Sequence, residues 1–334
     1  MRALVRGAGV AGLTLARELV LRGVETTVLE IRTGIDGNAS SMAGGMLAPW
    51  CERESAGEPV LQMGRSAADW WEDALPGHVV RAGTLVVAPA RDAPELARFS
   101  GRTTGHEPVD EAGVAALEPD LAGRFTRGLF FAGEAHLDPR RALPALRQRL
   151  SEEGVRFHFD AGKKSSCMAP ADHDVVADCT GMARAAVDPR LRGVRGEMLV
   201  LRSSDVSLSR PVRLLHPRIP VYVVPRSGNR FMVGATMIES SHGGPVTARS
   251  VMELLNAAYS LHPAFGEAEI VETGAGVRPA FPDNLPGVER EGRQIRINGL
   301  YRHGFLLAPA MARRAVDLLF AHFATGEVLH EACR

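Results

Sequence analysis

The chain has 334 residues, of which 45% are hydrophobic and 23% charged, and its 39 Lys and Arg residues balance 39 Asp and Glu residues. This length exceeds what one hydrophobic core usually supports, so we expect two domains or one domain with a large insertion. A formal charge of zero provides no global positive field for nucleic acid, and no stretch reaches the roughly 20 apolar residues needed to span a bilayer.

The start of the chain and its cysteines indicate a cytoplasmic protein. A glycine at position 7 leaves no room for the long apolar core of a signal peptide. The cysteines lie far apart without the spacing of a zinc site: Cys51, Cys167, Cys179 and Cys333. We therefore expect reduced thiols, no metal site and a soluble, cytoplasmic protein.

The predicted elements begin with a strand, a helix and a strand. The strands cover residues 3–5 and 25–30, and the helix between them runs to residue 21. Shorter elements of mixed type follow: helix 58–73, strand 83–87, helices 93–99 and 111–117, strand 127–132, and helix 139–153. Asp138 and Pro139 supply an N-cap and a first-turn proline for the last of these helices.

Strands dominate the second half of the chain. The predicted strands are 155–159, 174–178, 197–201, 213–216, 221–224, 230–235 and 294–298. Helices are predicted at 247–259 and 306–323, the latter with Pro309 in its first turn. The alternation predicts an α/β fold in which a Rossmann-like domain is interleaved with a sheet-based (α+β) substrate domain. The cofactor domain would comprise residues 1–75, 136–190 and 272–334, and the substrate domain 76–135 and 191–271.

The turn after the first strand has the spacing G-x-G-x-x-G, with glycines at 7, 9 and 12. In this motif the first glycine makes a tight turn, the second admits a pyrophosphate, and the third lets helix and strand pack closely. Glu30 ends the second strand, where a ribose-binding carboxylate belongs. We predict a dinucleotide site. The neighbouring Arg32 leaves open whether the ribose carries a 2′-phosphate. Arg6 is unusual, because strands of this type are usually apolar.

Five segments follow the order and spacing of one enzyme family. They are GAGVAG at 7–12, ASSMAGGMLAP at 39–49, YVVPR at 222–226 leading to VGATM at 233–237, GVRP at 276–279, and YRHGFLLAP at 301–309. In these segments the chain resembles the glycine oxidases of thiamine biosynthesis, members of the D-amino-acid oxidase superfamily. The resemblance covers nearly the full length and implies a D-amino-acid-oxidase-like fold with FAD as cofactor.

The resemblance also implies a substrate site. Arg278 matches the arginine that grips the substrate carboxylate, and Tyr222 the tyrosine that supports it; a guanidinium fork and a phenol suit this task. Met46 and Met237 match residues that line the family's small pocket, and Arg302 matches one near the flavin and the pocket mouth. Each residue has a structural alternative. Arg278 could form a structural ion pair, Tyr222 could be a core aromatic, and the two methionines could be ordinary core residues.

For the cofactor the resemblance implies contacts from the glycine turn, a small-residue loop, and the loop before the last helix. The residues are Gly7, Gly9, Val10, Ala11, Gly12, Glu30, Arg32, Ser40, Ser41, Gly44, Gly45, Met46, Thr180, Gly181, Arg278, Arg302, His303, Gly304, Phe305 and Leu306. No cysteine lies between Cys179 and Cys333, where the cysteinyl flavin link of monomeric sarcosine oxidases would fall. We therefore expect non-covalent FAD.

The implied reaction is oxidative deamination of glycine or another small amino acid or amine. A hydride passes from Cα to flavin N5, the imine is hydrolysed to an oxoacid and ammonia, and molecular oxygen is reduced to hydrogen peroxide. Positioning does most of the work, so neither His216 nor His303 is needed as a base. The expected partners are the small substrate and oxygen, with no nucleic acid or membrane; a homo-oligomer stays open.

Two other functions stay open. One is a dehydrogenase of the same fold that oxidises another D-amino acid or secondary amine and uses an acceptor other than oxygen. The other is a flavin-binding module without oxidase activity, in RNA modification or as a partner protein, which the balanced charge and the retained Arg278 and Tyr222 disfavour. The exact substrate, the acceptor, the oligomeric state, membership of thiamine biosynthesis and the adenine-side contacts within 155–181 are left open.

Overall fold

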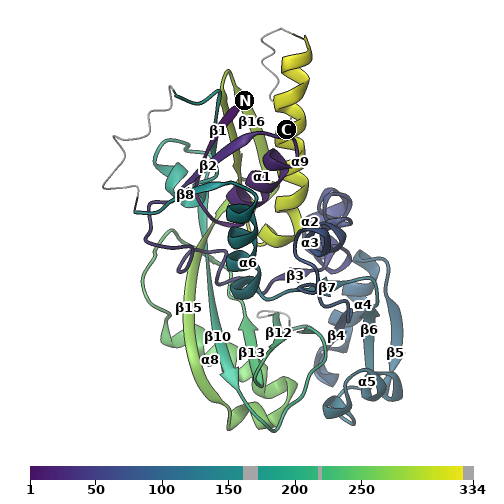
Figure 1. Ribbon diagram of the computed structural model, residues 1–334. Helices are drawn as coiled ribbons and strands as arrows, with labels where there is room; N and C mark the ends of the chain where they lie inside the picture. The colour runs from purple at the N-terminus through teal and green to yellow at the C-terminus, as the bar shows by residue number, and fades with distance from the viewer. Residues whose placement is uncertain (161–171, 217–219, 326–334) are drawn as a thin grey trace.

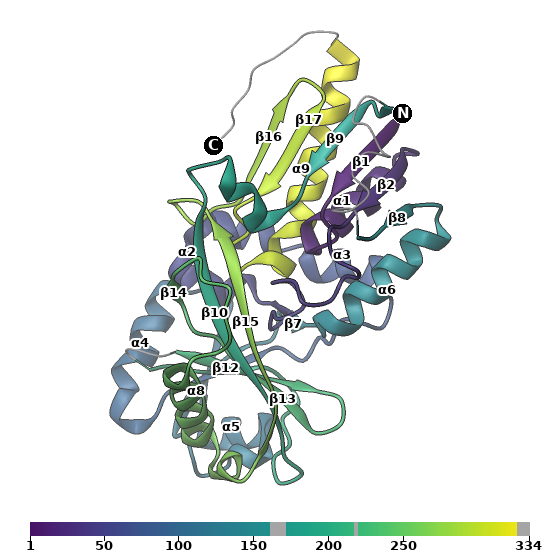
Figure 2. The same ribbon diagram turned by 90° about the vertical axis from the view of Figure 1, so that its left-hand side faces the viewer.

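A computed structural model describes residues 1–160, 172–216 and 220–325. A six-stranded sheet lies at one end of the molecule and a nine-stranded sheet at the other (Figure 1). The long strands β10 (Arg192–Arg202) and β15 (Glu269–Ala280) pair antiparallel and lead from the region between the sheets into the nine-stranded sheet (Figure 2). They join the two halves of the molecule.

The six-stranded sheet has the order β16-β17-β9-β1-β2-β8 and is parallel except for β16. Its strands are β1 Arg2–Arg6, β2 Glu25–Leu29, β8 Arg156–His158, β9 Val175–Asp178, β16 Gly287–Glu291 and β17 Gln294–Asn298. Helix α1 (Val10–Val20) packs on helix α9 (Gly304–Thr325) and also contacts helix α6 (Pro139–Glu152). A large apolar core fills this half, because parallel strands are covered on their faces by helices.

The second sheet has the order β14-β10-β13-β12-β11-β4-β6-β5, with β15 also paired to β10. Its other strands are β4 Thr84–Val87, β5 Glu107–Asp110, β6 Arg127–Phe131, β11 Val212–Leu214, β12 Val221–Arg226, β13 Arg230–Gly234 and β14 Ile238–Glu239. The helices α4 (Ala93–Arg102), α5 (Glu111–Leu117) and α8 (Ala248–Leu261) pack on it. A separate core lies between this sheet and its helices.

A small layer connects the halves. It contains the two-stranded sheet of β3 (Met46–Leu47) and β7 (Ala135–His136), with helices α2 (Pro49–Gly64) and α3 (Ala67–Ala74). Four 3-10 turns complete the described elements: Ala90–Asp92, Pro119–Leu121, Gly181–Ala186 and Pro263–Gly266. Both α2 and α3 pack on α9, so this layer rests on the half that contains the six-stranded sheet.

The expected single helix over 58–73 is wrong. Helix α2 begins at Pro49, a residue suited to a first turn, and α3 is a separate helix from Ala67. Gly57 interrupts α2 with a φ of 73°, a conformation that glycine adopts without strain. The amphipathic spacing along 58–73 therefore spans two helices that pack on one neighbour.

Pro309 lies in the second turn of α9, not in the first turn as expected, because this helix begins at Gly304. Proline cannot donate to the carbonyl four residues earlier, which belongs to Phe305. The indole N–H of Trp71 takes that place and donates to the Phe305 oxygen at 2.8 Å. A side chain from α3 thus satisfies the group that the proline leaves without a partner.

Strand β15 was not predicted from the sequence. Its glycines at 274 and 276 and its Pro279 weaken the local strand pattern. The glycines are needed for packing, since an added Cβ at Gly276 would approach the Ala39 backbone to 3.2 Å. The α/β fold with a Rossmann-like sheet and an interleaved second sheet is confirmed.

Candidate active site

A cavity of about 1300 Å³ lies between the two sheets and is lined by residues of both. Ordinary small-molecule pockets measure roughly 300–1,000 Å³, so this one is large enough for an extended cofactor together with a substrate. One end lies at the carboxyl ends of β1, β2 and β9, the edge where open α/β sheets bind ligands. The other end reaches strands β12 and β15.

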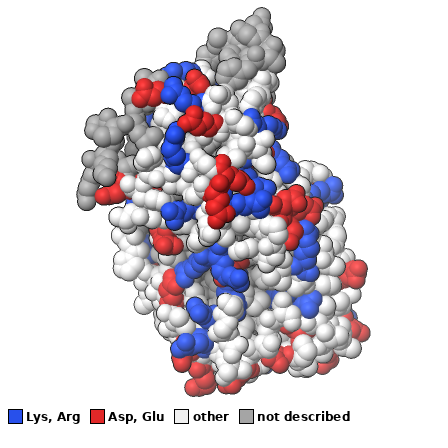
Figure 3. Space-filling model, in the orientation of Figure 1, with Lys and Arg blue, Asp and Glu red and all other residues white. Residues whose placement is uncertain are grey.

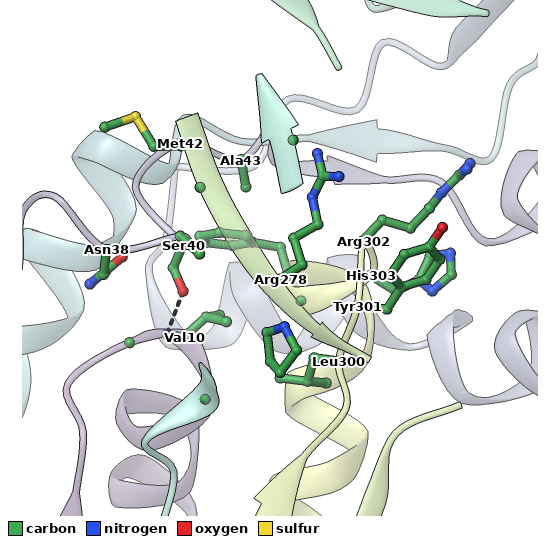
Figure 4. A pocket seen from close by; sticks show the side chains of 18 of the residues that line it. Val10, Asn38, Ser40, Met42, Ala43, Arg278, Leu300, Tyr301, Arg302 and His303 are labelled. Carbon is green, nitrogen blue, oxygen red and sulfur yellow. Dashed lines mark hydrogen bonds between the residues drawn. The ribbon is translucent and has the colours of Figure 1, made fainter. Parts of the chain in front are cut away.

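The glycine turn is shaped by close backbone contacts. Gly7 has a φ of 98°, and a Cβ there would lie 2.5 Å from the carbonyl oxygen of Cys179. A Cβ at Gly12 would overlap the carbonyl oxygen of Gly7, so the third glycine packs helix on strand and does not line the cavity. The Ser40 hydroxyl accepts a hydrogen bond from the Val10 amide at 3.1 Å (Figure 4).

Glu30 is buried beside this turn. One carboxylate oxygen accepts a hydrogen bond from the Ala8 amide at 2.9 Å, and the other accepts one from the Arg32 amide at 3.1 Å. A carboxylate has further lone pairs, so Glu30 can still accept hydrogen bonds from ribose hydroxyls. Arg6 is the exposed last residue of β1, which explains how the strand tolerates it.

The loop at 38–46 is fixed by hydrogen bonds and by close backbone contacts. Ser41 is buried, and its amide and hydroxyl both donate to Asn38, so it shapes the loop and does not line the cavity. Arg226 donates to the Gly44 carbonyl at 2.6 Å. A Cβ at Gly45 would overlap the carbonyl oxygen of Leu137. The backbone of this loop therefore forms a rigid wall of the cavity.

These residues fit FAD. A helix N-terminus suits a pyrophosphate, a buried carboxylate suits the ribose, and the cavity continues past the small-residue loop to the second sheet. The sequence left the adenine-side contacts within 155–181 open; in that segment Phe157 and Phe159 line the cavity with stacked rings, and Arg147 lies over both. Residues 161–171 of that part lie outside the described residues.

Arg278 points into the cavity from β15, as Figure 4 shows. Its side chain donates to the Thr236 carbonyl at 3.2 Å, and no carboxylate of the described residues lies within 4.0 Å of it. Burial lowers the pKa of Arg278 from its ordinary value, yet a guanidinium stays charged in a protein. An added Cβ at Gly196 would overlap the guanidinium, so this glycine makes room for it.

Tyr222 lines the cavity from β12. A Cβ at Gly44 would lie 2.7 Å from its ring, so the tyrosine packs directly on the backbone of the small-residue loop. Its direct cross-strand partners are Arg213 of β11 and Gly234 of β13. Tyr222 packs against a cluster of apolar side chains, which restricts its movement: Met42, Met46, Met198, Val200, Val224 and Met232.

The two predicted pocket methionines differ in their surroundings. Met46 lines the cavity and packs in the apolar cluster just described. Met237 lines the cavity too, but 49% of it is exposed. Its sulfur lies 3.5 Å from the Tyr301 hydroxyl and 3.3 Å from Arg302 Nη1. Met46 is thus a fixed wall, whereas Met237 lies at the mouth.

The structure brings most of the predicted site residues to this cavity, since apart from Gly12 and Ser41 all of them line it. It also adds a residue that the sequence analysis missed. Glu52 of α2 accepts hydrogen bonds from Arg302 Nε at 2.8 Å and from Nε2 of His303 at 2.8 Å, and it pairs with Arg213. The signal was an acidic residue directly after the apolar run 46–51, in the first turn of an unpredicted helix.

Glu52 is ionised despite its burial. Burial alone would raise the pKa of this carboxyl, but the charges of Arg302 and Arg213 and the His303 hydrogen bond hold it well below its ordinary value. Burial lowers the pKa of His303, so its imidazole is neutral. The Nε2–Glu52 hydrogen bond then requires the tautomer with a proton on Nε2.

Metal and membrane features were also sought in the described residues. They contain no cluster of three or more His, Cys, Asp or Glu side chains that could hold a metal ion. Over the same residues, every helix is too short or too polar to cross a membrane. Cys51 and Cys179 are buried and free, while Cys167 and Cys333 lie outside the described residues. On the face shown in Figure 3, acidic and basic side chains are intermixed.

A Rossmann-like sheet with a dinucleotide turn is joined by one cavity to a second sheet that carries an arginine with no carboxylate partner among the described residues. These features and the family match below define an FAD-dependent oxidoreductase. The family profile described as DAO, FAD dependent oxidoreductase, matches residues 2–318, and the chain belongs to this family. The predictions of an enzyme and of FAD as its cofactor are confirmed.

Individual relatives refine this similarity. The chain is 65% identical to a Rhizobium etli protein provisionally named thiamine biosynthesis oxidoreductase ThiO, over 93% of this chain and 94% of that protein. It is 28% identical to the glycine oxidase of Pseudomonas aeruginosa, over 95% and 94% of the two chains. The crystal structure of glycine oxidase from Geobacillus kaustophilus shares the fold, with a TM-score of 0.78, 24% identity and coverage of 99% and 96%. The resemblance to glycine oxidases is confirmed.

Proposed function

We propose that this enzyme oxidises glycine or another small amino acid or amine whose single carboxylate binds Arg278 and Tyr222. The observation that carries the proposal is the Arg278 guanidinium, which is partly buried, lines the cavity and has no carboxylate partner among the described residues. Removing a charge from water without a charged partner is costly, so a partly buried guanidinium that faces a cavity favours the binding of an anion there.

The shape of the group indicates which anion. A guanidinium presents parallel N–H donors that match the two oxygens of a carboxylate, and the Tyr222 hydroxyl can add a third hydrogen bond that fixes its rotation. The glycines at 44 and 196 bring the loop backbone against Tyr222 and leave room for Arg278. The geometry therefore favours a short ligand with its carboxylate between these two side chains.

The chemistry follows from this placement. Bound FAD would supply the acceptor, at flavin N5, for the hydride of the substrate Cα, and molecular oxygen would take the two electrons to give hydrogen peroxide. The protein binds the carboxylate, orients Cα and excludes bulk water. The substrate reacts as the neutral amine, and water converts the resulting imine to an oxoacid and ammonia.

The relatives support this assignment by their names, which are glycine oxidase for the Pseudomonas aeruginosa protein and thiamine biosynthesis oxidoreductase for the Rhizobium etli protein. We infer that the product of this enzyme serves thiamine biosynthesis.

FAD is proposed to bind non-covalently, in a domain made of residues 1–75, 136–190 and 272–334. Every strand of the six-stranded sheet falls within these segments, which supports the division. Strand β15 crosses the boundary at 271/272 and carries Arg278 beside the cofactor half.

The test is an anaerobic titration of the purified yellow protein with glycine, sarcosine and D-alanine. Bleaching of the flavin absorbance by a small amino acid or amine is expected, followed by one equivalent of peroxide when oxygen is admitted. Bleaching without peroxide would point to the dehydrogenase alternative. A flavin that none of these compounds reduces would contradict the proposal.

A further inference from the structure

Glu52 binds two of the other cations that line the cavity, Arg302 and Arg213. Its Oε2 lies 2.8 Å from Arg302 Nε and 2.7 Å from Arg302 Nη2, while its Oε1 pairs with Arg213. Glu52 is 8% exposed and Arg213 7% exposed, so this pairing is shielded from water. Ion pairs of this kind are screened little by salt and hold their geometry.

Arg278 does not form an ion pair with Glu52, although it lies next to Arg302. The backbone segments that carry the two arginines are joined by a hydrogen bond from the Tyr301 amide to the Pro279 carbonyl at 2.9 Å. In Figure 4 the Arg278 side chain extends upward and the Arg302 side chain extends to the right, away from it. Of the three arginines Arg213, Arg278 and Arg302, two are bound to Glu52 and one is left for a ligand.

We propose that Glu52 determines specificity: by holding Arg302 and Arg213 in ion pairs, it leaves Arg278 as the carboxylate-binding arginine and makes the site selective for ligands with one carboxylate. This inference rests on the function proposed above. A second carboxylate on a short ligand would need a second free cation, and Arg302 is already engaged. It would also approach the negative charge of Glu52, which repels it.

The test compares acetate with malonate as ligands of the holoenzyme, with binding followed by the change in flavin absorbance. The wild type should bind malonate no more tightly than acetate. Glu52→Gln frees Arg302 and removes the repulsion, so malonate should bind about tenfold more tightly relative to acetate, the gain from one charge-assisted pair. Glu58→Gln, an exposed change on the same helix, is the matched control and should behave as wild type.

The double variant Glu52→Gln/Arg302→Met assigns the gain to its source. Malonate preference should disappear in it, because Arg302, the freed cation that lies next to Arg278, has been removed. Glu52→Asp keeps the charge and should retain the wild-type preference. An unchanged ratio of malonate to acetate affinity in Glu52→Gln, or a gain that persists in the double variant, would overturn the inference.

Arg302→Met tests the same inference if Glu52→Gln does not hold FAD. Glu52 keeps Arg213 and His303 in this variant, so the core is not left with an unpaired carboxylate. The ratio of malonate to acetate affinity should not rise above that of wild type, because no cation is freed in this variant and Glu52 keeps its charge. A loss of acetate binding as large as that in Arg278→Ala would show that Arg302 also binds the ligand, and the inference would be wrong.

The same titrations separate this inference from the proposed function. Arg278→Ala should abolish acetate binding. If Arg278→Ala loses acetate binding and the Glu52 variants show no change in selectivity, the proposed function is supported and the proposed role of Glu52 is wrong. If Arg278→Ala binds acetate normally, the assignment of the carboxylate site is wrong, and so are the proposed function and the proposed role of Glu52.

Discussion

Gly196 of β10 lies directly against the guanidinium of Arg278 on the neighbouring strand β15, so that an added Cβ would overlap it. The position of the unpaired cation is thus set by the absence of a side chain on the adjacent strand. Backbone on one side and the cavity on the other leave the guanidinium little choice of position.

Gly196→Ala should therefore displace Arg278 and weaken substrate binding. Overpacking costs roughly 1–3 kcal/mol, so the KM for glycine should rise about tenfold or more, while FAD content stays the same. Gly101→Ala is the control, because nothing lies within 4 Å of a Cβ there. Steady-state kinetics on the two variants measures the effect, and an unchanged KM in Gly196→Ala would show that Arg278 is not displaced or does not bind substrate.

Arg226 should matter for the cofactor more than for the substrate. It donates to the Gly44 carbonyl at 2.6 Å and to the Leu137 carbonyl at 3.3 Å, and so ties the small-residue loop to the second sheet. Arg226→Met should weaken FAD affinity by about tenfold, since hydrogen bonds from a charged donor are worth about 1.5–3 kcal/mol. Fluorescence of released FAD on dilution reports the affinity. Arg230→Met, an exposed change at the end of the same hairpin, should release no more FAD than wild type.

Glu134 should make stability fall as pH rises. It is 1% exposed, and burial raises the pKa of its carboxyl to about 7. The folded state then binds more protons than the unfolded state between about pH 4.5 and 7, so the free energy of unfolding decreases through that window. Glu134→Gln removes this dependence and should be more stable than wild type at pH 8, by on the order of 3 kcal/mol at most.

The check is thermal unfolding of FAD-saturated protein at several pH values from 5 to 8. The Oε1 atom of Glu134 accepts a hydrogen bond from the Cys51 amide at 2.7 Å, and a glutamine oxygen can keep that bond. Parallel pH profiles for wild type and variant would mean that Glu134 does not titrate in this range.

Substrate size should be limited on one side of the pocket more than on the other. Tyr222 and Met46 are held by packed neighbours and reject added volume, whereas the half-exposed Met237 can move aside. Glycine and sarcosine should have higher kcat/KM than D-phenylalanine, with D-alanine between them. Peroxide release with the four compounds gives these ratios, and a preference for D-phenylalanine would contradict a small pocket.

The parts of the fold and site that local sequence determines were predictable. The glycine turn, Glu30 and the capped helix after Asp138 depend on short-range geometry, and the structure places them as expected. The resemblance added Arg278 and Tyr222, which lie on different strands and meet only in the folded chain. Their direct roles stay predictions until substrate binding is measured.

The rest depends on contacts between distant segments. Strand β15 carries glycines because other parts of the chain approach it closely. The same glycines weaken the strand pattern in the sequence, so the strand was not predicted. Glu52 lies outside every element predicted from the sequence, and no local pattern distinguishes it from the other acidic residues nearby. Its role appears only when residues 213, 302 and 303 surround it.

The most direct test of the account is anaerobic reduction of the flavin by glycine in Arg278→Ala, measured by stopped flow beside wild type and Arg249→Ala, a change to an exposed arginine of α8. Loss of a charge-assisted pair worth on the order of 3 kcal/mol should lower the apparent second-order rate of reduction about a hundredfold. FAD content and the flavin spectrum should stay as in wild type, and Arg249→Ala should reduce normally. Reduction of Arg278→Ala at the wild-type rate would contradict the carboxylate site on which the proposed function depends.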